Sequence, residues 1–139
     1  MTELIHLAEA SGITIEYCCL PLNGSISVQD DDGDFVIMDW ALSKWSTTAK
    51  VHLAHEIGHC VCGAFYNPYS SFDIRQKHEH RADKWAIKKL IPVDELDEAV
   101  AAGHTELWDL ADYFGVTEEF MKKAVCWYTH GNLAADLYF

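Results

Sequence analysis

The sequence predicts an α+β fold organised as a single domain. The chain has 139 residues, which fits one domain because two domains would each fall below the usual size. Strand-like and turn-like segments lie between residues 13 and 39, after a short helical pattern at 2–11, and helical patterns dominate from residue 46 onward. An N-terminal helix, then a small antiparallel sheet and then a series of helices is an α+β order of elements.

The first part of the chain predicts one helix and three strands. Residues 2–11 have the apolar spacing of a short amphipathic helix. Residues 13–19 are rich in β-branched and aromatic side chains, which predicts a strand. Residues 24–29 and 34–39 flank the turn-forming run at 30–33, so they predict a β-hairpin.

The second part of the chain predicts helices separated by short breaks. Ser46 or Thr47 can cap the first of them, and residues 63–71 have the composition of a loop. Pro92 stops the second helix or starts the third, and Gly115 is a natural C-terminal cap between the last two. The predicted helices cover about residues 47–62, 73–90, 93–101, 105–114 and 117–129.

Composition narrows the classes of partner and compartment. Ten Lys and Arg against 22 Asp and Glu give a net charge of −12, which argues against nucleic acid or an anionic membrane as the main partner. No apolar run approaches the ~20 residues of a membrane-spanning helix, and the N-terminus lacks the basic and apolar regions of a signal peptide. Five cysteines without an export signal do not predict a disulfide framework. We therefore expect a cytoplasmic protein whose thiols are mostly core residues.

The most informative segment is His55-Glu56-Ile57-Gly58-His59, an H-E-x-x-H pattern inside a predicted helix. Residues four apart share a helix face with Cβ atoms ~5–6 Å apart, so the two imidazoles can bind one Zn²⁺. Glu56 lies beside them, where it can take a proton from a water that the metal activates. The motif predicts a zinc site with His55 and His59 as ligands and Glu56 as the catalytic base.

A catalytic zinc site has three protein ligands and one open position, so a third ligand is required. The helix predicted at 73–90 has small and apolar residues at helical spacing, and Glu79 lies on or beside that face. Asp83 follows one turn later, where it can accept a hydrogen bond from a ligating imidazole. Glu79 is therefore the favoured third ligand, and Asp83 is expected to accept a hydrogen bond from a ligating histidine. The residues considered for the third position are His52, His78, Glu79, His80, Asp83, His104 and His130.

These residues resemble the signature of the ImmA/IrrE-type metallopeptidases. Downstream of the H-E-x-x-H segment, the chain is similar to that family's pattern E-x-x-A-[ND]-x-[FW]-A…L-x-P. Upstream, a Gly-Ile pair before a strand, a Leu-Pro pair, a hairpin and an apolar strand are also similar to the family. The matching residues are Gly12-Ile13, Leu20-Pro21, Asp39, Glu79, Ala82, Asp83, Trp85-Ala86 and Leu90-Ile91-Pro92.

The resemblance implies a compact minimal zincin, with a short sheet over two metal-bearing helices and one Zn²⁺ per chain. By position, His55 and His59 match the histidine ligands, Glu56 matches the base, and Glu79 matches the acidic ligand. The family implies a zinc endopeptidase, often carried by prophages or integrative elements, that cleaves or inactivates a helix-turn-helix repressor. Some members carry an additional repressor-type or sensor domain, and we expect none here.

Two features of the site have more than one candidate: the metal ion and the donor to the oxyanion. The metal is one, since Mn²⁺ or Fe²⁺ also bind sets of His and carboxylate ligands. The other is the donor for the oxyanion that develops during peptide hydrolysis. The candidates for this donor, or for contacts with substrate, are Tyr66, Tyr69, His78, His80 and His130.

Two alternatives to a peptidase concern binding. A zincin fold could sequester a repressor or toxin without hydrolysis, but a purely structural zinc site has no need of Glu56. Residues 107–125 faintly resemble a helix-turn-helix, but their acidic surroundings favour a packing pair of helices over DNA binding. Residues 51–92 carry six basic and four acidic side chains, a net +2, whereas the flanks carry −6 and −8. We expect these acidic flanks to suit a basic, DNA-binding protein as partner.

Overall fold

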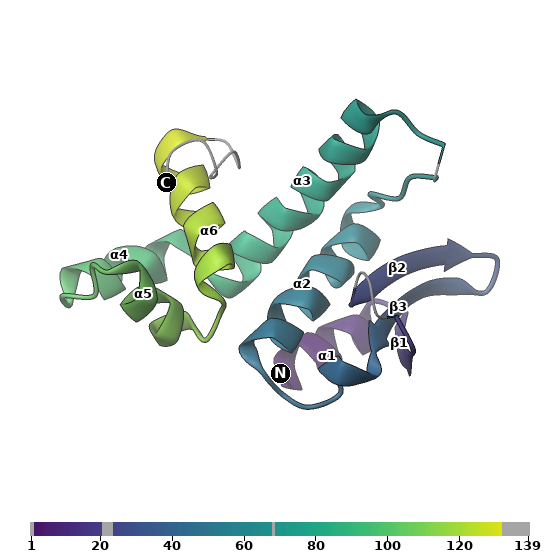
Figure 1. Cartoon of the computed structure of the whole chain (residues 1–139), viewed down its shortest axis with the longest axis horizontal. Helices are drawn as coiled ribbons and strands as arrows, with labels where there is room; N and C mark the ends of the chain where they lie inside the picture. The colour runs from purple at the N-terminus through teal and green to yellow at the C-terminus, as the bar shows by residue number, and fades with distance from the viewer. Residues whose placement is uncertain (1, 21–23, 68, 132–139) are drawn as a thin grey trace. The chain divides into compact units, whose positions relative to one another are not determined.

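The structure is a computed structural model that describes residues 2–20, 24–67 and 69–131. The chain divides into two compact units, Met1–Ala86 and Ile87–Phe139. The predicted α+β class is confirmed, because a small sheet near the N-terminus is followed by a series of helices (Figure 1). The expectation of one domain over the whole chain stays a prediction.

The first unit begins with a helix and three strands, each within one residue of its predicted bounds. A short 3₁₀ turn that was not predicted follows the third strand. Asp39 caps this turn, because its carboxylate accepts hydrogen bonds from the backbone N–H groups of Leu20 at 2.7 Å and Ala41 at 2.9 Å. The elements are α1 (Thr2–Ala10), β1 (Ile13–Cys18), β2 (Ser25–Asp30), β3 (Gly33–Asp39) and the turn η1 (Trp40–Leu42).

The sheet is mixed rather than wholly antiparallel, which corrects the predicted sheet. β2 and β3 form the expected antiparallel hairpin, with Ser25 opposite Met38 and Asp30 opposite Gly33. β1 lies on the other side of β3 and pairs with it in parallel. β2 therefore runs in the direction opposite to both β1 and β3. Turn residues predict only the β2–β3 pairing, because the edge that β1 joins depends on how the helices cover the sheet.

Two helices cover one face of this sheet. α1 packs against β1, and α2 (Thr47–Cys62) packs against β2 and β3 (Figure 1). The covered face carries Ile13, Val36 and Met38, whose exposed fractions are 4%, 0% and 1%. Burial of these apolar side chains ties α2, which carries the H-E-x-x-H segment, to the sheet.

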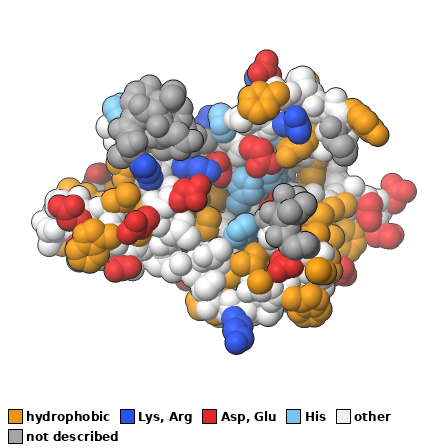
Figure 2. All heavy atoms as spheres, in the orientation of Figure 1, with side chains coloured by type: hydrophobic (Ala, Val, Ile, Leu, Met, Phe, Trp, Pro, Cys, Tyr) orange, Lys and Arg blue, Asp and Glu red, His pale blue; other side chains and the backbone are white. Residues whose placement is uncertain are grey.

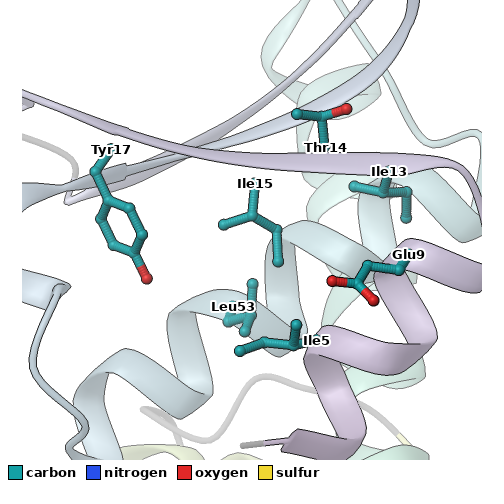
Figure 3. Close-up of a pocket in the computed structure, with 7 residues that line it drawn as sticks. All are labelled: Ile5, Glu9, Ile13, Thr14, Ile15, Tyr17 and Leu53. Carbon is teal, nitrogen blue, oxygen red and sulfur yellow. The ribbon is translucent and has the colours of Figure 1, made fainter.

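An open pocket of about 430 Å³ lies between β1, α1 and α2 (Figure 3). Its lining is largely aliphatic, and none of the predicted site residues belongs to it. The pocket is therefore a feature separate from the predicted metal site. The lining residues are Ile5, Glu9, Ile13, Thr14, Ile15, Tyr17 and Leu53.

Local signals set both ends of α2. The Ser46 hydroxyl accepts a hydrogen bond from the Ala49 backbone N–H at 3.0 Å, which satisfies a donor of the first turn. Gly63 ends the helix with a left-handed φ of 62°, a conformation that glycine adopts without strain. The N-terminal cap was one of the two that the sequence offered.

α2 lies very close to α3 (Phe72–Leu90) at one glycine. A Cβ atom built on Gly58 would lie 2.8 Å from the Ala82 carbonyl oxygen and 3.2 Å from Ala82 Cα. It would also lie 3.3 Å from an atom of the Trp85 ring. Because backbone atoms occupy this space, the two helices can approach to this distance only with glycine at position 58.

The second unit contains α4 (Val93–Ala101), α5 (Leu107–Phe114) and α6 (Glu118–His130). Gly115, with a left-handed φ of 65°, ends α5, and the Thr117 hydroxyl caps α6. α5 and α6 pack on each other through buried side chains, as a packing pair requires. These side chains include Leu110, Ala111, Phe114, Phe120, Met121 and Ala124.

Over the described residues, no helix combines the length and the hydropathy needed to cross a membrane. All five cysteines are free thiols. Cys60 and Cys126 are buried, and burial raises the pKa of Cys60 to about 12, which keeps this thiol protonated.

Candidate metal centre and active site

His55 and His59 stand one turn apart on α2 and direct the same ring nitrogen to a common point. Their Nε2 atoms are 3.2 Å apart, and the two rings meet nearly at right angles. The His59 side chain is 5% exposed and the His55 side chain is 20% exposed. Because a buried and a partly buried imidazole nitrogen face each other this closely, they need a shared proton or a shared cation between them.

Glu79 on α3 completes a group of three around that point. One carboxylate oxygen, Oε2, lies 2.8 Å from His55 Nε2, and the other, Oε1, lies 3.1 Å from His59 Nε2. One ligand atom from each of the three residues lies within 4.8 Å of the other two. In Figure 2, histidine side chains gather over α2 and α3 with an acidic side chain beside them.

The donor set fits a small divalent cation. Ligand atoms ~2.0–2.1 Å from a tetrahedral zinc ion are ~3.3 Å apart. The two histidine Nε2 atoms are 3.2 Å apart, and each of them has one Glu79 carboxylate oxygen within 3.1 Å. Two histidines and one glutamate also form a known catalytic zinc set, which leaves a fourth position for water or substrate. The structure therefore brings together the three ligands that the sequence predicts, in an arrangement that can hold one metal ion.

The other ring nitrogen of each histidine, Nδ1, has a hydrogen-bond partner of its own. His55 Nδ1 lies 2.7 Å from Asp83 Oδ1, and His59 Nδ1 lies 2.7 Å from the Ala64 carbonyl oxygen. Since both partners accept hydrogen bonds, each Nδ1 donates its proton to them and each Nε2 is left to face the metal position. Asp83 was predicted in this role, whereas the Ala64 carbonyl was not.

The comparison with known families decides what this geometry belongs to. The model of the IrrE N-terminal-like domain, peptidase family M78, matches residues 8–125. This chain belongs to that family. The match includes all three members of the metal cluster, Glu56 and Asp83, so the sequence-based resemblance is confirmed. No curated protein shows a significant match to the chain.

Membership of family M78, together with the metal cluster, supports metal-dependent peptidase activity for this chain. The family match alone does not distinguish one histidine from another, whereas the geometry indicates which residues could hold a metal ion. Of the residues considered for the third ligand, Glu79 is the one within reach of both histidine Nε2 atoms. His104 instead pairs with Asp109 at 2.8 Å in the second unit.

Replacing Asp83 with Ala is expected to lower the metal affinity of this IrrE-like chain about tenfold to a hundredfold. Loss of the carboxylate frees the His55 ring to rotate and removes the acceptor of its Nδ1 proton. Competition with a chromophoric chelator measures the affinity. Asp73→Ala, at the exposed start of the same helix, is the matched control, and equal affinities in the two variants would contradict the role of Asp83.

Metal uptake is expected to release protons at neutral pH. Burial lowers the pKa of His55, but hydrogen bonds to Asp83 and Glu79 outweigh it and raise the pKa to about 10. Burial opposes ionisation of Glu79 as well, but its bonds to both histidines hold its pKa well below the ordinary value. The cluster therefore keeps a proton on His55 at any pH below about 10, and a metal must displace it.

Because the metal competes with this proton, the apparent metal affinity is expected to increase with pH. Affinity is expected to rise about tenfold for each pH unit between 6 and 9, with about one proton released per ion. Calorimetry in buffers of different ionisation enthalpy measures the proton count. Uptake without proton release at pH 7 would show that His55 is already deprotonated.

The five candidates for oxyanion or substrate contacts differ in position. The Tyr66 hydroxyl donates a hydrogen bond to Glu79 Oε1 at 2.8 Å, so it lies at the metal cluster. Burial, together with this bond, raises the pKa of Tyr66 to about 12 and keeps its hydroxyl a donor. The His78 ring stacks on Tyr66 with centroids 6.0 Å apart. Tyr69 is 96% exposed, His80 is exposed, and His130 ends α6 in the second unit.

Glu56 faces β2 rather than α3. It is 6% exposed, and its Oε2 accepts a hydrogen bond from the Ser25 hydroxyl at 2.7 Å. Ser25 Oγ also lies 2.7 Å from Nδ1 of His52, which stands one turn before Glu56 on the same helix. His52 was considered as a metal ligand, and the structure instead places it in this second cluster.

Sequence reasoning did not connect Ser25 with the site. The signal that could have found it is the i, i+4 spacing of His52 and Glu56, which places both on one helix face. A polar residue at the start of the strand covered by that face was the remaining clue. Strand order was needed to bring the two together.

Proposed function

We propose that this chain is a zinc-dependent endopeptidase that hydrolyses a peptide bond in a helix-turn-helix repressor of a prophage or other mobile element. The observation that carries the proposal is the cluster of His55, His59 and Glu79, with Glu56 next to His55 in the H-E-x-x-H segment of α2. Membership of a peptidase family supports hydrolysis. A purely structural zinc site has no need of a general base such as Glu56.

The proposed mechanism assigns one task to each group. A zinc ion held by the three ligands would supply Lewis acidity, which polarises a peptide carbonyl and makes a water more acidic. Glu56 accepts the proton of the attacking water and passes it to the nitrogen of the leaving amine. Asp83 and the Ala64 carbonyl keep both histidine rings in their binding orientation.

Tyr66 is the candidate best placed to stabilise the oxyanion. Its hydroxyl is already at the cluster and remains protonated throughout the physiological pH range. It donates to Glu79 here, so stabilising the transition state requires it to turn to the substrate oxygen. His78 supports the ring from one side by stacking.

The proposed substrate class rests on charge. The exposed hairpin turn carries Asp30, Asp31 and Asp32, and α6 begins with Glu118 and Glu119. Each acidic group would attract a basic DNA-binding protein. Changing either group to the corresponding amides is expected to weaken repressor binding, and more strongly at low salt. Unchanged binding in both variants, measured by calorimetry, would exclude electrostatic docking.

Cleavage of a repressor encoded beside this gene tests the proposed function. The purified chain loaded with zinc is expected to convert the repressor into defined fragments, chelation is expected to stop the reaction, and restored zinc to restart it. Mass spectrometry identifies the fragments. A stable complex with an intact repressor would instead support the alternative, a non-proteolytic module that sequesters its partner.

A further inference from the structure

The Ser25 hydroxyl bridges two polar groups that face the sheet from α2. Ser25 is the first residue of β2 and is 5% exposed. Its Oγ lies 2.7 Å from Glu56 Oε2 and 2.7 Å from His52 Nδ1. A buried hydroxyl with two short contacts on one helix face is a connected network rather than a chance approach.

The number of available protons determines which group donates in each hydrogen bond of this network. A hydroxyl has one proton to donate, and an ionised carboxylate can only accept. Ser25 therefore donates to Glu56, and its oxygen accepts from His52 Nδ1–H. Burial lowers the pKa of His52, which favours a neutral ring. A neutral ring that donates to the Ser25 oxygen carries its single proton on Nδ1.

The chain backbone is shaped to bring this hydroxyl to α2. Gly24 precedes Ser25 with a φ of +75°, and a Cβ atom at Gly24 would lie 3.0 Å from Cε1 of His52. The His52 ring thus lies directly against the glycine. The Gly24 carbonyl also accepts a hydrogen bond from the Asp39 backbone N–H at 2.7 Å, which fixes the start of β2 against β3.

We propose that Ser25 and His52 are positioning residues that hold the Glu56 carboxylate by Oε2 in the orientation needed for proton transfer. This inference rests on the proposed peptidase function. The contact engages Oε2 alone and restricts rotation of the carboxylate, which leaves Oε1 to act as the base. Without the contact, the carboxylate can rotate, and fewer encounters with the water are productive.

Kinetics of matched variants test this role. Ser25→Ala is expected to lower kcat about tenfold to a hundredfold, with KM and zinc content little changed, because neither ligand nor substrate contact is removed. Ser25→Thr keeps the hydroxyl and is expected to restore most of the rate. Ser27→Ala, on the same strand and the same face, is the control with wild-type activity.

The pair of residues can be tested as one unit. Ser25→Ala combined with His52→Leu is expected to cost no more than the larger single substitution, since both act through Glu56. Additive losses, or a loss confined to KM, would overturn the inference. A wild-type protein that cleaves no repressor would count against the proposed function instead.

A second measurement tests the inference without an activity assay. Ring-nitrogen NMR of the full chain is expected to show the His52 proton on Nδ1, and Ser25→Ala is expected to shift it toward Nε2. A wild-type ring protonated on Nε2 would overturn the inference, because Ser25 could not then donate to Glu56. This readout remains valid when Ser25→Thr fails to fold.

Discussion

Replacing Glu56 with Gln is expected to lower the cleavage rate by about 10²–10⁴, the usual contribution of a positioned general base. Glutamine has nearly the same shape, and its carbonyl oxygen can still accept the Ser25 hydroxyl that now binds Oε2. It cannot take a proton from water at neutral pH. The metal ligands are untouched, so zinc content measured by elemental analysis should equal that of the wild type.

The comparison needs a control for the change of charge. Glu95→Gln makes the same substitution at an exposed position in the first turn of α4 and should leave cleavage unchanged. A Glu56→Gln protein that has lost its zinc would mean that the variant reports on metal binding rather than on proton transfer. Cleavage at the wild-type rate with zinc retained would remove Glu56 from the mechanism.

The sequence predicts the metal cluster well because its members are set by local spacing. His55 and His59 share a face of one helix by their four-residue interval, whatever the rest of the fold does. Glu79 could be favoured because the apolar period of its helix indicates which side packs inward. Asp83 follows from the same period, one turn further on, and it bonds His55 Nδ1.

The contacts that were not predicted depend on how distant segments meet. Ser25 reaches Glu56 only because β2 lies at the sheet edge covered by α2, and the predicted antiparallel sheet did not specify that order. The Ala64 carbonyl faces His59 because Gly63 turns the chain back at the end of α2. Tyr66 was one of five equal candidates, since loop composition gives no direction for a side chain.

Replacing Gly58 is expected to give the largest loss of stability in the first unit. In an ordinary helix interior, Gly→Ala stabilises by ~1 kcal/mol. Here the new Cβ would lie 2.8 Å from the Ala82 carbonyl oxygen, and that oxygen is backbone and cannot rotate away. Gly58→Ala should therefore destabilise the protein, by about 1–3 kcal/mol, so the sign is opposite to the helix-propensity effect.

Gly58→Val should be worse, because two more carbon atoms enter a space that already lacks room for one. A loss of about 3 kcal/mol or more is a large part of the usual 5–15 kcal/mol stability of a small protein. Urea unfolding of the metal-free proteins measures both variants, and Val61→Ala, at an exposed position of α2, is the control.

Gly58→Ala is also expected to affect metal binding, because Gly58 lies between the two helices that carry the metal-binding residues. Pushing α2 away from α3 moves His55 and His59 relative to Glu79, and their present separations are only 2.8 to 3.2 Å. Gly58→Ala should thus lower zinc affinity together with stability. A stabilised variant with unchanged affinity would show that the helices do not need their close approach at this residue.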